Sequence, residues 1–132
     1  MTVKERAEKG SEYKAKGTYN CTRSVLAAFD DIINVDADEL TTKTAGFAAG
    51  MGNMEGTCGA LIGAIMVAGI LTDGKGTPKY SRLIVDKFKE LSGATICRDL
   101  KGVSTGNMLT SCPDCVRNAI LALGHAFETE EI

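Results

Sequence analysis

The sequence contains no tryptophan, and its few aromatic residues are three tyrosines and four phenylalanines. Proteins that bind single-stranded nucleic acid commonly stack bases on aromatic side chains, so this scarcity argues against such a surface. The net charge is only −2, and neither sign gathers into a stripe. Without a basic patch, nucleic acid is not an expected partner.

Long apolar stretches are also missing. The longest apolar run, Cys58 to Leu71, is shorter than the roughly 20 apolar residues that a helix needs to cross a bilayer. The chain is charged from its first residues and lacks the apolar core of a signal peptide there. We therefore expect no membrane association and a cytoplasmic location, where thiols are mostly kept reduced.

The alternation of valine and isoleucine that is typical of strands is absent, so no sheet is expected. Apolar residues recur instead every three or four positions, as they do in helices. The length fits one domain with its own core. We predict an all-α single domain over residues 1–132, with its core at about 13–127. It would be a bundle of about five or six helices around a central apolar helix.

Capping residues and glycines set the expected helix boundaries. Asp36 or Asp38, Thr57, Thr77 and Ser111 are the predicted N-caps. The run from 58 to 71 is apolar on every side, so other helices should surround it. Its Gly59 and Gly63 should allow close helix packing. The predicted helices are 3–16, 20–33, 36–48, 58–71, 77–92 and one from 112 onward, with a short helical turn at 95–100.

Five cysteines stand out against this background, and they fall near the starts of the apolar stretches. They are Cys21, Cys58, Cys97, Cys112 and Cys115. In a reducing compartment such a set favours catalytic, redox or metal chemistry over structural disulfides. A helix N-terminus favours the thiolate, which is both the nucleophile and the metal ligand. A cysteine on an apolar stripe can equally be core filler.

Cys112 and Cys115 form a Cys-Pro-Asp-Cys motif in which both sulfurs lie within one helical turn. Short redox pairs and halves of zinc sites share this spacing. Asp114 lies between them, and its negative charge should raise the pKa of both thiols. The single histidine, His125, does not follow the pair directly, so covalent haem attachment is not supported.

The chain resembles a family of small bacterial and archaeal proteins named for the cysteine pattern C…GCAxxG…C…C and described as redox-active. The resemblance rests on motifs that occur in the same order along nearly the whole chain. These are Tyr19-Asn20-Cys21, Gly50-Met51-Gly52, Cys58-Gly59-Ala60-x-x-Gly63, Cys97-Arg98-Asp99-Leu100 and Cys112-Pro113. The resemblance implies a helical domain with four characteristic cysteines, Cys21, Cys58, Cys97 and Cys112. Cys115 is an addition to that pattern and is expected to be accessory. A related domain occurs in a haem protein, so the resemblance leaves cofactor binding open.

Three hypotheses follow for the cysteines. The first is a thiol–disulfide redox or electron-transfer protein, a thiol-based oxidoreductase that needs no cofactor. Its leading nucleophiles would be Cys58 and Cys112, with Cys21, Cys97 or Cys115 as resolving partners. The partner would be a redox protein or a small thiol, and the chain could form a homo-oligomer.

The second hypothesis is a module that binds zinc or an iron–sulfur cluster through Cys21, Cys58, Cys97 and Cys112. It ranks below the first because zinc sites usually draw their ligands in closely spaced cysteine pairs. The third hypothesis is a non-enzymatic interaction module in which the cysteines only pack or lock helices.

Overall fold

Seven α-helices build the protein, and the computed structural model describes all of residues 1–132. Their bounds are α1 Val3–Ala15, α2 Cys21–Ala27, α3 Ala37–Thr44, α4 Gly59–Thr72, α5 Thr77–Ser92, α6 Cys97–Lys101 and α7 Cys112–Ala126. A 3-10 turn, Ala45–Phe47, and a π-helical turn, Gly50–Met54, join α3 to α4. The all-α prediction is confirmed, because the only β-type pairs are two isolated bridges.

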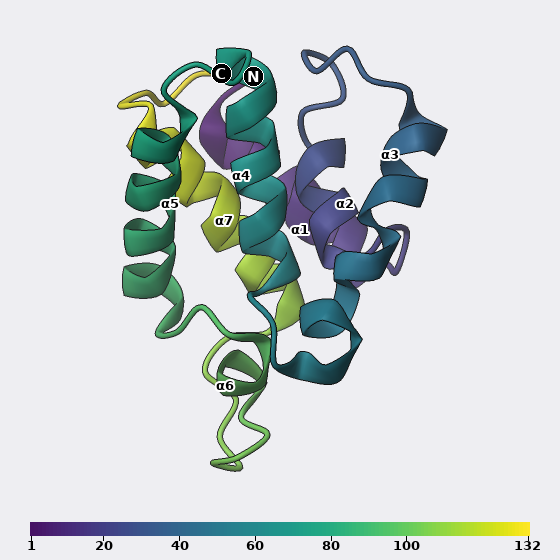
Figure 1. The fold of residues 1–132 in the computed structure, drawn as a ribbon, viewed down its shortest axis with the longest axis vertical. Helices are drawn as coiled ribbons and strands as arrows, with labels where there is room; N and C mark the ends of the chain where they lie inside the picture. Colours follow the sequence, from purple (N-terminus) through teal and green to yellow (C-terminus); the bar gives the residue numbers. More distant parts are fainter.

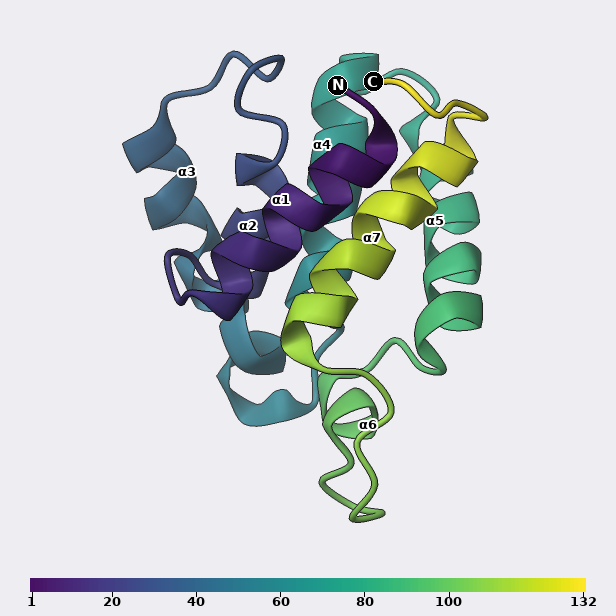
Figure 2. The ribbon, with the colours of Figure 1, turned by 180° about the vertical axis from the view of Figure 1, so that it is seen from behind.

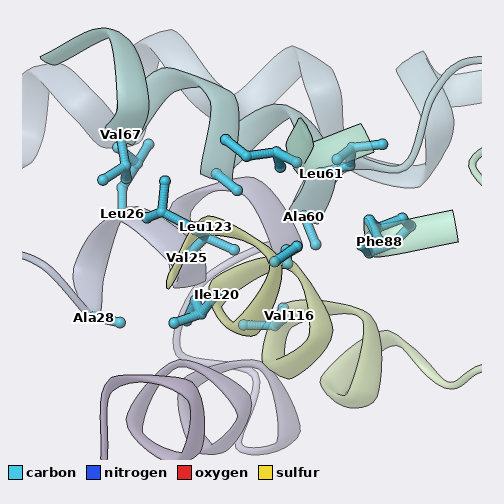
Figure 3. Close-up of a cluster of buried hydrophobic side chains, with 14 of the residues drawn as sticks. Val25, Leu26, Ala28, Ala60, Leu61, Val67, Phe88, Val116, Ile120 and Leu123 are labelled. Atoms are coloured by element: carbon cyan, nitrogen blue, oxygen red, sulfur yellow. The ribbon is translucent and has the colours of Figure 1, made fainter. Parts of the chain in front are cut away.

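The apolar helix α4 stands between α5 and α2 in Figure 1. Figure 2 shows α1 and α7 running side by side across the opposite face. The helix α7 packs against α1, α2, α4 and α5, and α4 packs against α2, α5 and α7. The core lies where these helices meet. Figure 3 shows some of its fully buried side chains, among them Leu26 of α2, Leu61 and Val67 of α4, Phe88 of α5 and Ile120 of α7.

The apolar sequence of α4 predicted that other helices would surround it on every side. That prediction is wrong for one side of the helix. Ile62, Ile65, Met66 and Gly69 lie at spacings of three and four residues and form a strip that stays half-buried. The opposite side of the helix, which includes Ala60, is fully buried. None of the helices combines the length and the hydropathy that a membrane-spanning helix requires.

Two of the predicted N-caps are confirmed and two are wrong. The side chains of Asp36 and Ser111 accept backbone N–H groups at the starts of α3 and α7. Thr57 does not cap α4, because it is extended and forms a β-bridge with Ile96, and Cys58 takes the N-cap position instead. Gly76 precedes α5 in the left-handed conformation, which glycine adopts at little cost, so Thr77 lies inside the helix.

The helix α2 ends at Ala27, earlier than the predicted residue 33, where the N–H groups of Phe29 and Asp30 bond three residues back. Arg6 of α1 holds the turn that follows. Its guanidinium Nη1 donates a hydrogen bond of 2.8 Å to the carbonyl oxygen of Ala28. The carbonyl oxygen of Ala28 is therefore turned toward α1. The N–H group of Ile32 bonds to the carbonyl oxygen of Phe29, three residues back, as in a tighter turn. Asp31 in this turn holds the same guanidinium through an Nη2–Oδ2 distance of 3.0 Å.

Candidate functional site

Four cysteines occupy the starts of four different helices. Cys21, Cys97 and Cys112 are the first residues of α2, α6 and α7, and Cys58 is the N-cap of α4. Figures 1 and 2 show that α4 and α7 begin at the same end of the bundle, beside α6. Cys115 follows one turn along α7. The fold thus gathers residues from distant parts of the sequence at one end of the bundle.

These five cysteines, here called the thiol cluster, all carry free thiols. Cys112 is half-buried and the other four are buried. Burial raises the pKa of Cys21 and of Cys97, and negative charge on Cys58 or Cys112 would raise both further. The helix starts that carry these residues meet at one end of the bundle, so the thiols influence one another's pKa across four helices.

Cys115 lies in the most polarised part of the thiol cluster. Its pKa is lowered, first because the Cys58 thiol hydrogen-bonds to its sulfur and then because Lys101 adds a positive charge, and together these outweigh burial. The Nζ atom of Lys101 lies 3.5 Å from Cys115 Sγ and donates a 3.0 Å hydrogen bond to the carbonyl oxygen of Thr110. Burial lowers the pKa of Lys101, but charge on Cys115 and Cys112 outweighs it and raises that pKa. In its thiol form Cys115 donates to the carbonyl oxygen of Thr110 at 3.8 Å, and a thiolate there has the Lys101 cation beside it.

Cys58 does not have the lowered pKa that its position at a helix start predicted. Its pKa is raised, mainly because its thiol hydrogen-bonds to Cys115 and because it is buried. The backbone N–H groups of Leu61 and Ala60 favour its thiolate, as expected at a helix N-terminus, but they are outweighed. The expectation of a Cys58 thiolate is thus wrong, and its role next to Cys115 is that of a donor.

The expected effect of Asp114 is also wrong for Cys115, whose pKa is lowered rather than raised. The Asp114 carboxylate binds the guanidinium of Arg117 on the exposed side of α7. Arg117 also binds Glu8 of α1, so the charge of Asp114 is compensated away from the thiols. Lys101 is the charged residue that acts on Cys115 instead.

No group of three or more cysteine, histidine, aspartate or glutamate side chains is arranged to hold a metal ion. The predicted four-thiolate site of Cys21, Cys58, Cys97 and Cys112 therefore has no support from the arrangement of these side chains.

Two glycines of the sequence motifs allow the chain to approach the sulfur atoms closely. A Cβ atom on Gly59 would lie 2.4 Å from Cys21 Sγ and 2.7 Å from Thr22 Oγ1. A Cβ on Gly50 would lie 2.5 Å from the Cβ of Cys97, and Gly50 also has a positive φ of 58°. Gly63 packs in the same way on the backbone of Thr22. The interpretation of Gly59 and Gly63 as close-packing residues agrees with these distances.

We expect the substitution Gly59→Ala to destabilise the protein by about 1–3 kcal/mol, the usual cost of overpacking. Gly69→Ala is the matched control in the same helix, because a Cβ there meets nothing within 4 Å. It should stabilise by about 0.5–1 kcal/mol, since alanine loses less backbone entropy in a helix. Urea unfolding of both variants measures the difference. Equal effects of the two substitutions would show that Gly59 has no special packing role.

No sequence pattern pointed to Lys101 or Thr22. Lys101 is one of many lysines, and only its place at the end of the short α6 brings it to Cys115. The buried hydroxyl of Thr22 lacks a hydrogen-bond partner in the thiol form of the cluster. It lies close enough to Cys21 to favour the thiolate there, although burial of Cys21 has the larger effect.

The fold and the thiol cluster define a cysteine-rich, all-α class of protein. Within that class, the chain belongs to the family described as "Putative redox-active protein (C_GCAxxG_C_C)", whose model matches residues 19–125. A search of curated proteins and a search of solved structures each gave no match. The family description points to redox activity and names no reaction, substrate or cofactor.

Proposed function

We propose that the protein carries out thiol–disulfide exchange through Cys112 and Cys115. The observation that carries this proposal is the pair's unequal setting within one helical turn. Cys112 is half-buried, whereas Cys115 is buried with Lys101 3.5 Å from its sulfur. A reachable thiol and a buried, stabilised thiolate are the two parts that a dithiol exchange needs.

In this scheme the Cys112 thiolate attacks a disulfide of the partner, and one partner thiolate leaves and takes up a proton. The Cys115 thiolate then attacks Cys112 Sγ, which breaks the mixed disulfide and releases the second partner thiolate, again as a thiol once protonated. Two electrons pass from the Cys112–Cys115 pair to the partner disulfide. The pair is thereby oxidised to a disulfide, and the partner is reduced to two thiols. Reduction of the protein by a small thiol or a redox protein reverses the sequence.

Cys58 and Lys101 support the attacking sulfur of Cys115. Lys101 Nζ lies 3.5 Å from this sulfur, and the raised pKa of Cys58 favours the protonated form of the neighbouring thiol. Cys21 and Cys97 have pKa values raised by burial, which argues against a first attack by either of them. Their role in this proposal is packing at the starts of α2 and α6, which retains the third hypothesis for part of the cluster.

The test is to map the bonds formed when the reduced protein meets a small neutral disulfide, hydroxyethyl disulfide. Alkylation and mass spectrometry should find one reversible bridge, Cys112–Cys115. The variant Cys115→Ser should stop at a mixed disulfide on Cys112, because the resolving thiolate is gone. Cys97→Ser is the control and should form the bridge as the wild type does. The proposal fails if no reversible bridge forms, or if Cys115→Ser forms the same bridges as the wild type.

A further inference from the structure

A pocket of about 370 Å³ lies where the end of α1, the start of α2 and α3 meet. Ligand pockets for small molecules typically begin at about 300 Å³, so this one suits a small ligand or one group of a larger ligand. Its polar and aromatic lining consists of Lys14, Thr18, Tyr19, Asn20, Arg23 and Thr41. Two of these side chains are cationic and none of the lining residues is acidic.

Arg23 is 1% exposed, yet its charge is only partly compensated. Its Nε atom donates to Thr41 Oγ1 at 3.2 Å, and its Nη1 atom reaches Asp30 Oδ1 at 3.3 Å. The third nitrogen, Nη2, is buried without a hydrogen-bond partner. The guanidinium carbon lies 4.7 Å from the centre of the Tyr19 ring, which adds a cation–π contact. A buried guanidinium with an unused donor is costly unless a ligand completes its bonds.

Lys14 adds a second cationic side chain to the pocket, and its charge is not compensated. It is half-buried and takes part in none of the protein's ion pairs. Its ammonium group acts on the thiol of Cys21, which follows the lining residue Asn20 in the chain. The pocket therefore adjoins the thiol cluster through the start of α2.

We propose that this pocket binds the oxyanion of a small molecule, a carboxylate or a phosphate, between Lys14 and Arg23. A carboxylate and a phosphate both accept hydrogen bonds from the planar guanidinium of arginine, and both pair with the ammonium group of lysine. They therefore share one recognition chemistry. Thr18 supplies a further polar group to the lining, whereas the Asn20 side chain is already bonded to Thr44 O and Arg23 N. Binding of this anion does not depend on thiol–disulfide exchange, and the inference stands or falls separately from that proposal.

The experiment titrates the reduced protein with inorganic phosphate and, separately, with succinate. The intrinsic fluorescence of tyrosine reports the binding, because the chain has no tryptophan and Tyr19 lies in the pocket. At least one of the two anions should give a saturable change with a dissociation constant of about 1 mM or lower. Glycerol, a neutral solute, should give none. Saturation by phosphate alone or by succinate alone identifies which oxyanion the pocket accepts.

The substitution Lys14→Gln should raise the dissociation constant of the anion about tenfold, since a hydrogen bond to a charged group contributes about 1.5 kcal/mol or more. Arg23→Lys keeps the charge but removes the unpartnered Nη2 donor, and it should weaken binding as well. Lys75→Gln changes an exposed lysine in the turn between α4 and α5 and should leave binding unchanged. Equal affinity in Lys14→Gln, Lys75→Gln and the wild type, or no saturable change with either anion, would overturn the inference.

Discussion

The substitution Lys101→Met is expected to slow the resolution of a mixed disulfide on Cys112 about tenfold at neutral pH. The cause is loss of the charge that lies 3.5 Å from the sulfur of Cys115. An interaction of this kind, from a charged donor, typically contributes about 1.5–3 kcal/mol, and about 1.4 kcal/mol corresponds to a factor of ten. Methionine preserves the length and apolar stem of lysine, so packing changes little. The lifetime of the mixed disulfide, followed by quenching and mass spectrometry, measures the effect.

The pH dependence separates this electrostatic role from a structural one. In the wild type the pKa of Cys115 lies below the usual thiol value of 9.0, so the rate of resolution should rise with pH with a midpoint below pH 9.0. Without Lys101 the same rise should occur at higher pH, and the two rates should converge in alkaline solution. Lys87→Met, at a partly exposed lysine of α5 that pairs with Glu90, is the control. A wild-type pH profile in Lys101→Met would remove Lys101 from the mechanism.

The second large effect is expected for Arg6→Ala, which should lower the free energy of unfolding by about 3 kcal/mol. Arg6 is 1% exposed and lies over the ring of Phe29 at 4.9 Å. Its Nε atom donates to the backbone oxygen of Ile132 at 2.9 Å, and its Nη1 atom donates to Ala28. Alanine would leave a cavity and two carbonyl groups without a donor. Thermal unfolding should shift downward by about 10 °C for a domain of this size.

Arg117→Ala is the matched control, because this arginine of α7 binds Glu8 and Asp114 at the surface. Exposed ion pairs contribute about 0–1 kcal/mol, so its effect should be small. Acid should reduce the effect of both substitutions, because Arg117 likewise lowers the pKa of Glu8. The hydrogen bond from Arg6 lowers the pKa of Asp31, and its stabilising effect is lost as the pH falls through that lowered pKa. The difference in free energy of unfolding between the wild type and Arg6→Ala should therefore become smaller in acid. If Arg117→Ala lost as much stability at neutral pH as Arg6→Ala does, the structural role assigned to Arg6 would be contradicted.

The sequence was sufficient for the features that depend on local patterns. Spacing of apolar residues identified the helices, and the capping roles of Asp36 and Ser111 followed from side chains that accept neighbouring N–H groups. The cysteines at helix starts were also evident, because each precedes or opens an apolar run. What brings them together is the packing of α2, α4, α6 and α7 around shared glycines.

The parts that could not be predicted depend on contacts between distant residues. The turn after α2 is held by Arg6, which reaches Ala28 from another helix. The direction of the pKa shift at Cys58 depends on Cys115 and on burial, since the local helix N-terminus alone favours the opposite direction. In both cases the outcome involves residues that are distant in the sequence.

The placement of Cys112 and Cys115 within one turn of α7 has a thermodynamic consequence. A bridge between them closes a very short loop, so in the chain-entropy model it restricts the unfolded chain much less than a Cys21–Cys58 bridge would. Oxidation at this pair is then only weakly linked to global folding. Its reduction potential should be governed by the local setting of the two thiols, above all by the Lys101 charge beside Cys115, and the protein could cycle between redox states without losing or gaining much conformational stability.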